Sequence, residues 1–408
     1  MEVVLFKTEF LSVLRLVFLD IPYPKKEIDS LWKEMLLYQF HDILPGTSIK
    51  RVYEESWGRY RKLMQTCNNI IREILLKIST PFNRIPFTEE TTVPYSNLQN
   101  SNRISAFNFL PWKTAIWFES KRGWSKIKAP AMGFTLLTPD EGKRKFPELK
   151  YDDKRIENNL LILTSDNNGA ICSLYDREAE CEVMQQNKEA ACFTVYSDQG
   201  DAWDFDPEYR VNGKRVTLIE QNSFISGPYL YTKQIFSYKV SKIVQKIRLT
   251  TGSSRIDFTL KIEWHEAGTM LRVSFPVNIP GERAFCGSAF GAVERPVQST
   301  TSWERAKDEV PVQGWADIST NNYGTALISP TKYGYRVKEN TLDLCLLRSV
   351  PFPGSPLLAQ GYTDLGLHKC CYSFPPHRGN YAAGKVANTA EENKIPGADN
   401  HRRRARTS

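Results

Sequence analysis

The segment QFHDILPGTS, residues 39–48, places an imidazole directly beside a carboxylate, at His41 and Asp42. Imidazole nitrogen and carboxylate oxygen are both common ligands of Zn²⁺ in proteins, and the chain contains only five histidines. A histidine near the end of a helix can also interact with the helix dipole, or it can be a buried polar residue. The residues alone leave these three roles of His41 open.

Helices are predicted to position this pair. Apolar residues at a spacing of three and four predict a helix over residues 25–42, and Pro45 with the following glycine interrupts it. Thr47 or Ser48 is suited to cap a second, longer helix that ends near Pro81. His41 and Asp42 are therefore expected at the end of the first of these helices.

The first twenty residues are apolar, but four charged residues interrupt them: Glu2, Lys7, Glu9 and Arg15. A signal peptide would have an unbroken apolar core, and a membrane span needs about twenty residues nearly free of charge. The apolar residues at 10, 11, 14, 17 and 18 instead follow one face of a helix. We therefore expect no membrane as a partner, and a helical bundle over residues 1–80.

The apolar period changes further along the chain. Residues 81–102 are polar and contain prolines, which predicts a linker. From 103 to 380 the period is two, as in RIDFTLKIEW at 255–264, and a hairpin is predicted with its turn at Asn168-Gly169. Residues 381–408 lose the pattern and are predicted to be disordered. The expected fold class is α+β multidomain, an N-terminal α-helical bundle followed by antiparallel β-sandwich domains.

Charge and cysteine content limit the partners. The net charge is +8, and four of these charges are arginines of the terminal segment HRRRARTS. No broad basic face is indicated, so nucleic acid is not expected as a partner; the tail itself is either a disordered end or a nucleic-acid or localisation patch. Eight cysteines without a CxxC pair fit a reducing compartment.

Several longer blocks resemble one enzyme family. LWKEMLLYQFHDILPGTSIKRVYEES resembles the signature of glycoside hydrolase family 38, the zinc-dependent retaining α-mannosidases. FGAVERPVQSTTSWERAKDEVPVQGWADIS at 290–319, AFNFLPW at 106–112 and DAWD at 201–204 agree with it. The blocks are similar to the C-terminal half of the cytosolic or vacuolar branch of that family. The resemblance covers about residues 8–380, without the catalytic barrel.

The resemblance implies roles for particular residues. His41 matches a zinc ligand, and Asp42 matches the residue that hydrogen-bonds the hydroxyls of the bound mannose. Zinc would bind two neighbouring sugar hydroxyls, while one carboxylate attacks the anomeric carbon and a second carboxyl protonates the leaving oxygen. Asp201 and Asp204 would border the sugar site, or they would close a loop by accepting backbone N–H bonds.

The sequence also departs from the family pattern. The other zinc ligands of the family lie on an H-x-D motif, and none of the five histidines here begins one. The nucleophile and the acid also belong to the catalytic domain, so no catalytic residue is assigned in this chain. Gln298 and Thr300 stand where the family more often has His and Asn. We therefore expect a C-terminal fragment of an α-mannosidase that is inactive alone.

Partners and compartment follow from this interpretation. The expected partners are a mannose-containing oligosaccharide, an N-glycan or a free oligosaccharide, together with the missing catalytic domain or a second copy of the chain. The expected cofactor is zinc, in the complete enzyme, and the expected location is cytoplasmic, with a vacuolar or lysosome-like compartment as the alternative. A different function remains open: a stand-alone carbohydrate-binding or scaffolding β-sandwich.

Overall fold

The computed structural model describes residues 1–79, 104–120, 123–137, 145–204, 208–353 and 361–394. These residues form two compact units, and the boundary between the two lies at Lys145. The predicted linker at 81–102 and the basic C-terminal segment lie outside the described residues. None of the described helices is long and apolar enough to cross a membrane.

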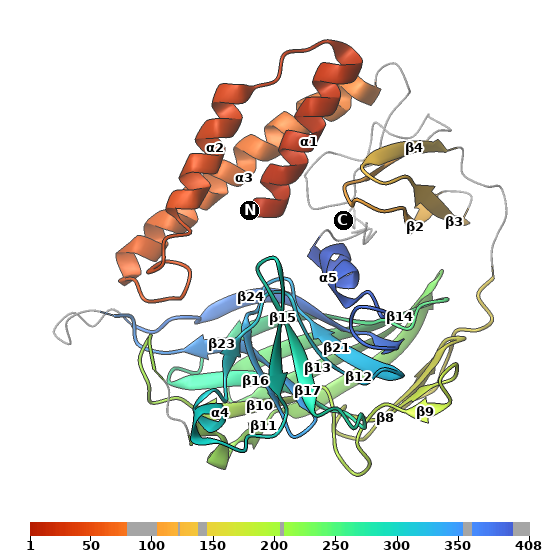
Figure 1. Cartoon of the computed structure of the whole chain (residues 1–408), viewed down its shortest axis with the longest axis vertical. Helices are drawn as coiled ribbons and strands as arrows, with labels where there is room; N and C mark the ends of the chain where they lie inside the picture. Colours follow the sequence, from red (N-terminus) through yellow and green to blue (C-terminus); the bar gives the residue numbers. More distant parts are fainter. Residues whose placement is uncertain (80–103, 121–122, 138–144, 205–207, 354–360, 395–408) are drawn as a thin grey trace, which may run out of the picture. The chain divides into compact units, whose positions relative to one another are not determined.

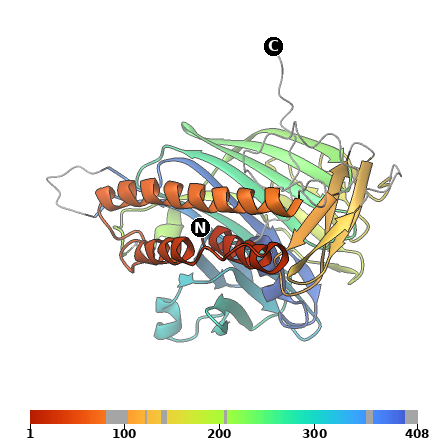
Figure 2. The same cartoon turned by 90° about the horizontal axis from the view of Figure 1, so that it is seen from above.

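Three helices begin the first unit: α1 (Glu2–Leu19), α2 (Lys25–Leu37) and α3 (Lys50–Ser79). They run side by side as a bundle (Figures 1 and 2). Their buried apolar side chains form one cluster of Leu5, Leu31, Met35, Leu63 and Cys67. A second cluster contains Leu11, Ile71 and Ile74 of the helices together with Phe109 from a later segment. The helical start of the predicted fold class is confirmed.

The apolar face of α1 is only partly buried. Of the apolar residues that follow one face of this helix, Leu11 is buried, whereas Phe18 is 61% exposed. Thr8 and Ser12 are buried instead, and their hydroxyls donate to backbone carbonyl oxygens one turn earlier at 2.8 and 2.7 Å. Because these polar groups are satisfied within the helix, their burial costs little.

The helix predicted over 25–42 ends earlier, at Leu37. After that residue the backbone N–H groups of Gln39 and Phe40 donate to carbonyl oxygens three residues back, rather than four. Such tight turns at a helix end change the direction of the chain. His41 and Asp42 therefore lie in a turn beyond α2, not within it.

Two antiparallel pairs of strands also belong to the first unit. Strand β1 (Ile104–Asn108) pairs with β4 (Gly133–Leu137), and β2 (Thr114–Ser120) pairs with β3 (Gly123–Ala129). Phe109, which follows β1, lies against Phe10 of α1 with ring centroids 5.3 Å apart. The start of the predicted β region therefore belongs to the same compact unit as the helices.

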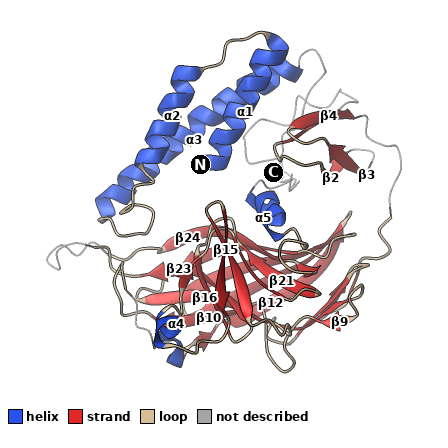
Figure 3. Cartoon of the chain, viewed as in Figure 1, coloured by secondary structure: helices blue, strands red, loops and turns tan. Residues whose placement is uncertain are grey.

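The second unit consists of three antiparallel sheets (Figure 3). The five-stranded sheet contains β5 (Lys150–Tyr151), β6 (Arg155–Glu157), β7 (Leu161–Ser165), β8 (Ile171–Asp176) and β9 (Cys181–Glu182). The six-stranded sheet has the order β11 (Lys214–Arg215), β10 (Cys192–Ser197), β16 (Thr269–Pro276), β23 (Thr341–Ser349), β22 (Gly334–Lys338) and β19 (Val310–Pro311).

The largest sheet has ten strands. Its order is β12 (Thr217–Ser226), β13 (Tyr229–Tyr238), β14 (Ser241–Thr250), β15 (Ile256–Trp264), β24 (Gly366–Phe374), β21 (Tyr323–Ile328), β20 (Trp315–Ser319), β17 (Arg283–Ser288) and β18 (Gly291–Pro296), and β25 (Pro376–Arg378) pairs with β21. A 3₁₀ turn, η2 (Tyr209–Asn212), and a short helix, α4 (Ser302–Ala306), lie between strands.

The six- and ten-stranded sheets face each other across one core. Phe258 of β15 and Phe275 of β16 belong to different sheets, and their ring centroids are 5.7 Å apart. The alternation predicted for β15 is confirmed, because Ile256, Phe258, Leu260, Ile262 and Trp264 are all buried. The predicted β-sandwich class is therefore confirmed.

The predicted hairpin is also confirmed. Strands β7 and β8 pair antiparallel around Asn168-Gly169. Gly169 has a φ of 78°, and a Cβ added there would lie 2.8 Å from Nε2 of Gln234. Both the backbone conformation and the close approach of Gln234 favour glycine at this position.

The prediction of disorder is wrong for the first part of the tail. Residues 386–394 form a helix, α5 (Val386–Lys394). Its Val386 and Ala390 are buried in a cluster with Trp315 and Ile328, against which Tyr381 also packs. The sequence did not predict this helix, because two apolar residues four positions apart are a weak pattern. The helix is stabilised instead by its contacts with strands β20 and β21, which are distant in sequence.

Candidate functional site in the turn between helices α2 and α3

His41 and Asp42 lie in the turn that connects α2 to α3. The side chain of His41 is 78% exposed and that of Asp42 is 54% exposed, with Nε2 and Oδ2 3.7 Å apart. The ring of Phe40 lies against the imidazole, with ring centroids 4.2 Å apart. The turn thus presents an imidazole and a carboxylate together at the surface of the first unit.

This exposure argues against two of the roles that the sequence left open for His41. A residue that is mostly exposed is not a buried polar group. The helix dipole acts within the last turn of a helix, whereas His41 lies four residues beyond Leu37, the last residue of α2. The role of His41 as a zinc ligand stays a prediction.

Hydrogen bonds hold the backbone of the turn. The hydroxyl of Tyr53, on α3, accepts from the N–H of Ser48 at 3.1 Å and lies 3.3 Å from the carbonyl oxygen of Asp42. The side chain of Ser48 donates to the same carbonyl at 2.8 Å, and Thr47 Oγ1 lies 3.2 Å from it. Thr47 and Ser48, which were predicted to cap the helix, thus bind the backbone of Asp42.

Few possible metal ligands lie close together in the described part of the chain. Within the described residues, no group of three or more His, Cys, Asp or Glu side chains could hold a metal ion. His41 and Asp42 supply one imidazole and one carboxylate, which suit zinc by type but are fewer than the three protein ligands of a usual catalytic zinc site. A zinc site that includes His41 therefore needs ligands from outside the described residues.

Asp201 and Asp204 lie in the second unit, in loop 198–204 after β10. Asp201 Oδ1 accepts from the N–H groups of Trp203 and Asp204 at 2.8 and 2.9 Å. These bonds, first that from Asp204, lower the pKa of the Asp201 carboxyl. Asp201 therefore closes the loop, as one of the two predicted roles requires, and the indole of Trp203 beside it is 62% exposed.

Asp198 and Arg348 were not singled out in the sequence. Asp198 follows β10 directly, its side chain is fully buried, and it forms an ion pair with Arg348 of β23. The two residues are 150 positions apart. No local sequence pattern connects residues so far apart, so this ion pair had no signal in the sequence.

A buried ionic cluster in the six-stranded sheet was also missed. Arg272 of β16 pairs with Asp343 of β23 and with Glu309, and Arg210 pairs with Asp343 at 2.7 Å. Burial acts to raise the pKa of Asp343, but Arg272 and Arg210 together hold it below its usual value. Since positive and negative groups neutralise one another here, the cluster is structural.

Of the two departures from the family pattern, the structure explains Thr300 but not Gln298. The N–H and hydroxyl of Thr300 donate to Glu304 Oε2 at 2.8 and 2.9 Å, next to the capping box that begins α4. Thr300 therefore helps to fix the start of this helix. Gln298 is exposed, and nothing in the structure explains it.

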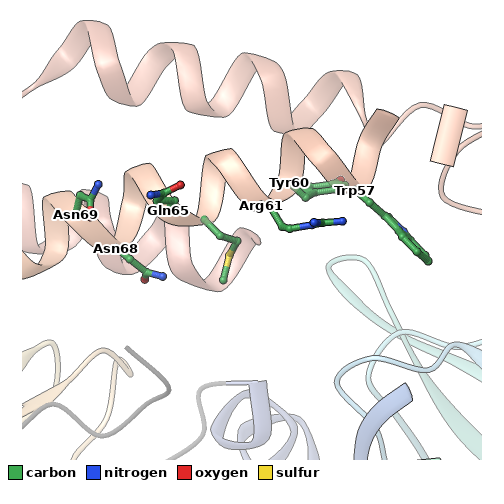
Figure 4. A pocket seen from close by; sticks show the side chains of 7 residues that line it. Trp57, Tyr60, Arg61, Gln65, Asn68 and Asn69 are labelled. Atoms are coloured by element: carbon green, nitrogen blue, oxygen red, sulfur yellow. The ribbon is translucent and has the colours of Figure 1, made fainter. Parts of the chain in front are cut away.

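A shallow pocket runs along α3 (Figure 4). Its lining residues all belong to this helix: Trp57, Tyr60, Arg61, Met64, Gln65, Asn68 and Asn69. Neither His41 nor Asp42 lines it. The pocket and the candidate ligands are therefore separate features of the first unit.

Comparison with known families agrees with this arrangement. A model described as the alpha mannosidase middle domain matches residues 1–78, and a model described as the glycosyl hydrolases family 38 C-terminal domain matches residues 156–355. Together they match more than half of the chain. This chain belongs to glycoside hydrolase family 38. The resemblance predicted from the sequence blocks is confirmed for the middle and C-terminal domains of the family.

Curated relatives of this family 38 chain are α-mannosidases. The sequence is 28% identical to Alpha-mannosidase G of Dictyostelium discoideum over 94% of this chain and 40% of the relative. It is 25% identical to Alpha-mannosidase 2C1 of Mus musculus over 97% of this chain and 38% of the relative. The chain thus spans about two fifths of the length of these relatives.

A solved structure shows the same fold. An α-mannosidase from Enterococcus faecalis V583 superposes with a TM-score of 0.72 at 16% identity, over 96% of this chain and 55% of that structure. The fold of this family 38 chain therefore also occurs as part of a longer solved protein.

Proposed function

We propose that this chain supplies the middle and C-terminal domains of a zinc-dependent, retaining α-mannosidase. The carrying observation is the exposed pair His41 and Asp42, held on a hydrogen-bonded turn within the segment that matches the family 38 middle domain. A catalytic domain, on the same polypeptide or on another, contributes the nucleophile, the acid and the remaining zinc ligands.

His41 and Asp42 have distinct roles in this proposal. The imidazole of His41 is a zinc ligand, and the carboxylate of Asp42 accepts hydrogen bonds from hydroxyls of the bound mannose. Zinc, when bound, stabilises negative charge on the oxygen atoms that it contacts. The turn holds the two side chains adjacent before substrate binds, and this reduces the entropy lost on binding.

The proposed substrate is a terminal α-mannosyl residue of an N-glycan or of a free oligosaccharide. Loop 198–204, with Asp204 and Trp203, borders the substrate in the assembled enzyme, and Asp201 keeps that loop closed. The eight cysteines are all free thiols, and this supports a reducing, cytoplasmic compartment.

A chimera tests the proposed function. This chain would replace the matched region of Dictyostelium Alpha-mannosidase G, and release of nitrophenol from nitrophenyl α-mannoside would be measured. We expect turnover by the chimera, none by the chain alone, and loss of at least about a hundredfold with His41→Ala, because a zinc ligand is removed. His265→Ala is the matched control, since His265 is an exposed imidazole beside a carboxylate, Glu263, at 3.6 Å.

Two results would contradict the proposal. One is turnover of the α-mannoside by the chain alone. The other is a folded, active chimera in which His41→Ala has no more effect than His265→Ala. Mannoside binding by the chain alone, unaffected by His41→Ala, would instead favour a stand-alone carbohydrate-binding protein.

A further inference from the structure

Arg348 contacts loop 198–204 at two residues, Asp198 and Asp204. Its Nε and Nη2 donate to the two carboxylate oxygens of Asp198, with Nη2 and Oδ1 3.1 Å apart. Nη2 also donates to the carbonyl oxygen of Asp204 at 2.6 Å. One guanidinium therefore fixes the distance between Asp198 and Asp204, which are six positions apart in the chain.

The contact with Asp198 depends on both partners. The Asp198 side chain is fully buried, whereas that of Arg348 is 20% exposed. Besides the bidentate guanidinium, the carboxylate accepts the N–H of Gly200 at 3.0 Å. Removal of Arg348 would leave a buried carboxylate without its counter-charge, which is costly enough to make the loop rearrange.

Hydrogen bonds within the loop connect Arg348 to Trp203. The N–H of Asp201 donates to the same Asp204 carbonyl that Arg348 contacts, at 3.0 Å. In turn Asp201 Oδ1 accepts from the N–H of Trp203. Three consecutive contacts therefore connect the guanidinium to the backbone of the exposed tryptophan.

The strand that carries Arg348 is itself fixed. The N–H of Arg348 donates to Asp364 Oδ2 at 3.2 Å, and its carbonyl oxygen accepts from the hydroxyl of Thr363 at 3.0 Å. Both contacts come from the segment that precedes β24. The segment before β24 therefore holds the backbone of Arg348, while its guanidinium contacts loop 198–204.

We propose that Arg348 is a positioning residue for substrate binding: it sets loop 198–204 so that Trp203 and Asp204 contact the mannoside. This inference rests on the proposed function, in which the loop borders the substrate. An exposed indole can pack against the apolar C–H face of a sugar ring, and a carboxylate accepts hydrogen bonds from sugar hydroxyls. Both contacts require that the loop has one conformation before substrate binds.

Variants of the chimera test this role through KM and kcat separately. Arg348→Met should raise KM for the α-mannoside by about tenfold or more and change kcat by less than about threefold, because substrate contacts are misplaced while the reacting groups are not. Asp198→Asn should act in the same direction, and Arg348→Lys should restore part of the affinity. Arg283→Met is the control, since it removes an exposed ion pair, with Glu294, from the same unit.

Fluorescence of the loop gives a second readout. Acrylamide quenching of Trp203, obtained as the difference from matched Trp203→Phe proteins, should increase in Arg348→Met and stay unchanged in Arg283→Met. An active, folded chimera whose KM is unchanged by both Arg348→Met and Asp198→Asn would overturn the inference and leave the proposed function intact. A folded chimera without turnover would overturn both.

Discussion

At the residue scale, the turn between α2 and α3 combines two opposite properties. Its backbone is fixed by the hydroxyls of Tyr53 and Ser48, while the side chains of His41 and Asp42 remain exposed. A turn whose backbone is satisfied internally can present side chains outward without rearranging when a ligand binds. Tyr53, in the first turn of α3, therefore supports the turn that carries His41 and Asp42.

Tyr53→Phe should loosen this turn. The variant loses hydrogen bonds to the N–H of Ser48 and the carbonyl of Asp42, each worth about 1 kcal/mol of stability. We expect a small loss in thermal stability of the chain and a decrease of several fold in turnover by the chimera. Tyr151→Phe, which changes an exposed tyrosine of the second unit, is the control. Equal activity of the two variants would show that the hydroxyl of Tyr53 does not support the site.

The buried carboxylate of Asp257 is expected to make the free energy of unfolding depend on pH. Burial opposes its charge, but Arg255 and Arg248 outweigh burial and lower its pKa to about 2. Because the folded-state pKa lies below the unfolded value, this carboxylate stabilises the fold above the unfolded pKa, and the contribution disappears as the pH falls from about 4 to about 2. Its magnitude is roughly 2 kcal/mol.

Urea unfolding of the chain at pH 6 and pH 3 measures this dependence. The wild-type chain should lose more stability between these two pH values than Asp257→Asn does. Asp153→Asn, at an exposed position, should behave like the wild type. An identical pH dependence for Asp257→Asn and the wild type would contradict the assignment.

At the element scale, periodic sequence patterns predicted where helices and strands lie. They predicted less well the residues at which these elements end. The alternation of β15 and the turn at Asn168-Gly169 depend on neighbours in sequence, so the sequence was sufficient for both. The end of α2 at Leu37 and the helix α5 depend on tertiary contacts. A helix of nine residues with two buried side chains is not stable alone, so only its docking on β20 and β21 explains it.

Substitutions within α5 test this docking. Ala390 is 3% exposed, whereas Ala387, on the same helix, is exposed. Ala390→Asp would bury an unpaired charge and should destabilise the second unit by several kcal/mol or detach the helix. Ala387→Asp should be nearly neutral, because its carboxylate stays in water near the N-terminus of the helix. Hydrogen exchange over residues 386–394 measures both effects, and equal protection in the two variants would contradict the docked helix.

At the scale of the whole molecule, the site could be predicted only in part. His41 and Asp42 are adjacent in sequence, so their pairing needed no structure. The contact between Arg348 and Asp198 joins residues 150 positions apart, and no local pattern announces it. Asp201 and Asp204 were predicted either to border the sugar site or to close a loop, and the structure shows that Asp201 closes it.

The first unit also carries exposed apolar side chains that suit an interface. Phe6, Phe18, Leu36, Leu37 and Phe40 are all exposed. Such a set binds other proteins or promotes aggregation when it stays uncovered. The chain alone should therefore bind a hydrophobic dye, and Phe18→Ser with Leu37→Ser should reduce the signal. A chain that stays monomeric without any dye signal would count against an interface with a catalytic domain.

The most direct test of the central claim is the zinc content of three dialysed proteins: the chain alone, the chimera, and the chimera with His41→Ala. If His41 completes a zinc site whose other ligands lie on the catalytic domain, the chimera should retain about one zinc per molecule, and the chain alone essentially none. The His41→Ala chimera should lose most of its zinc, whereas a His265→Ala chimera should keep it. Stoichiometric zinc in the chain alone, or full retention in the His41→Ala chimera, would contradict the account.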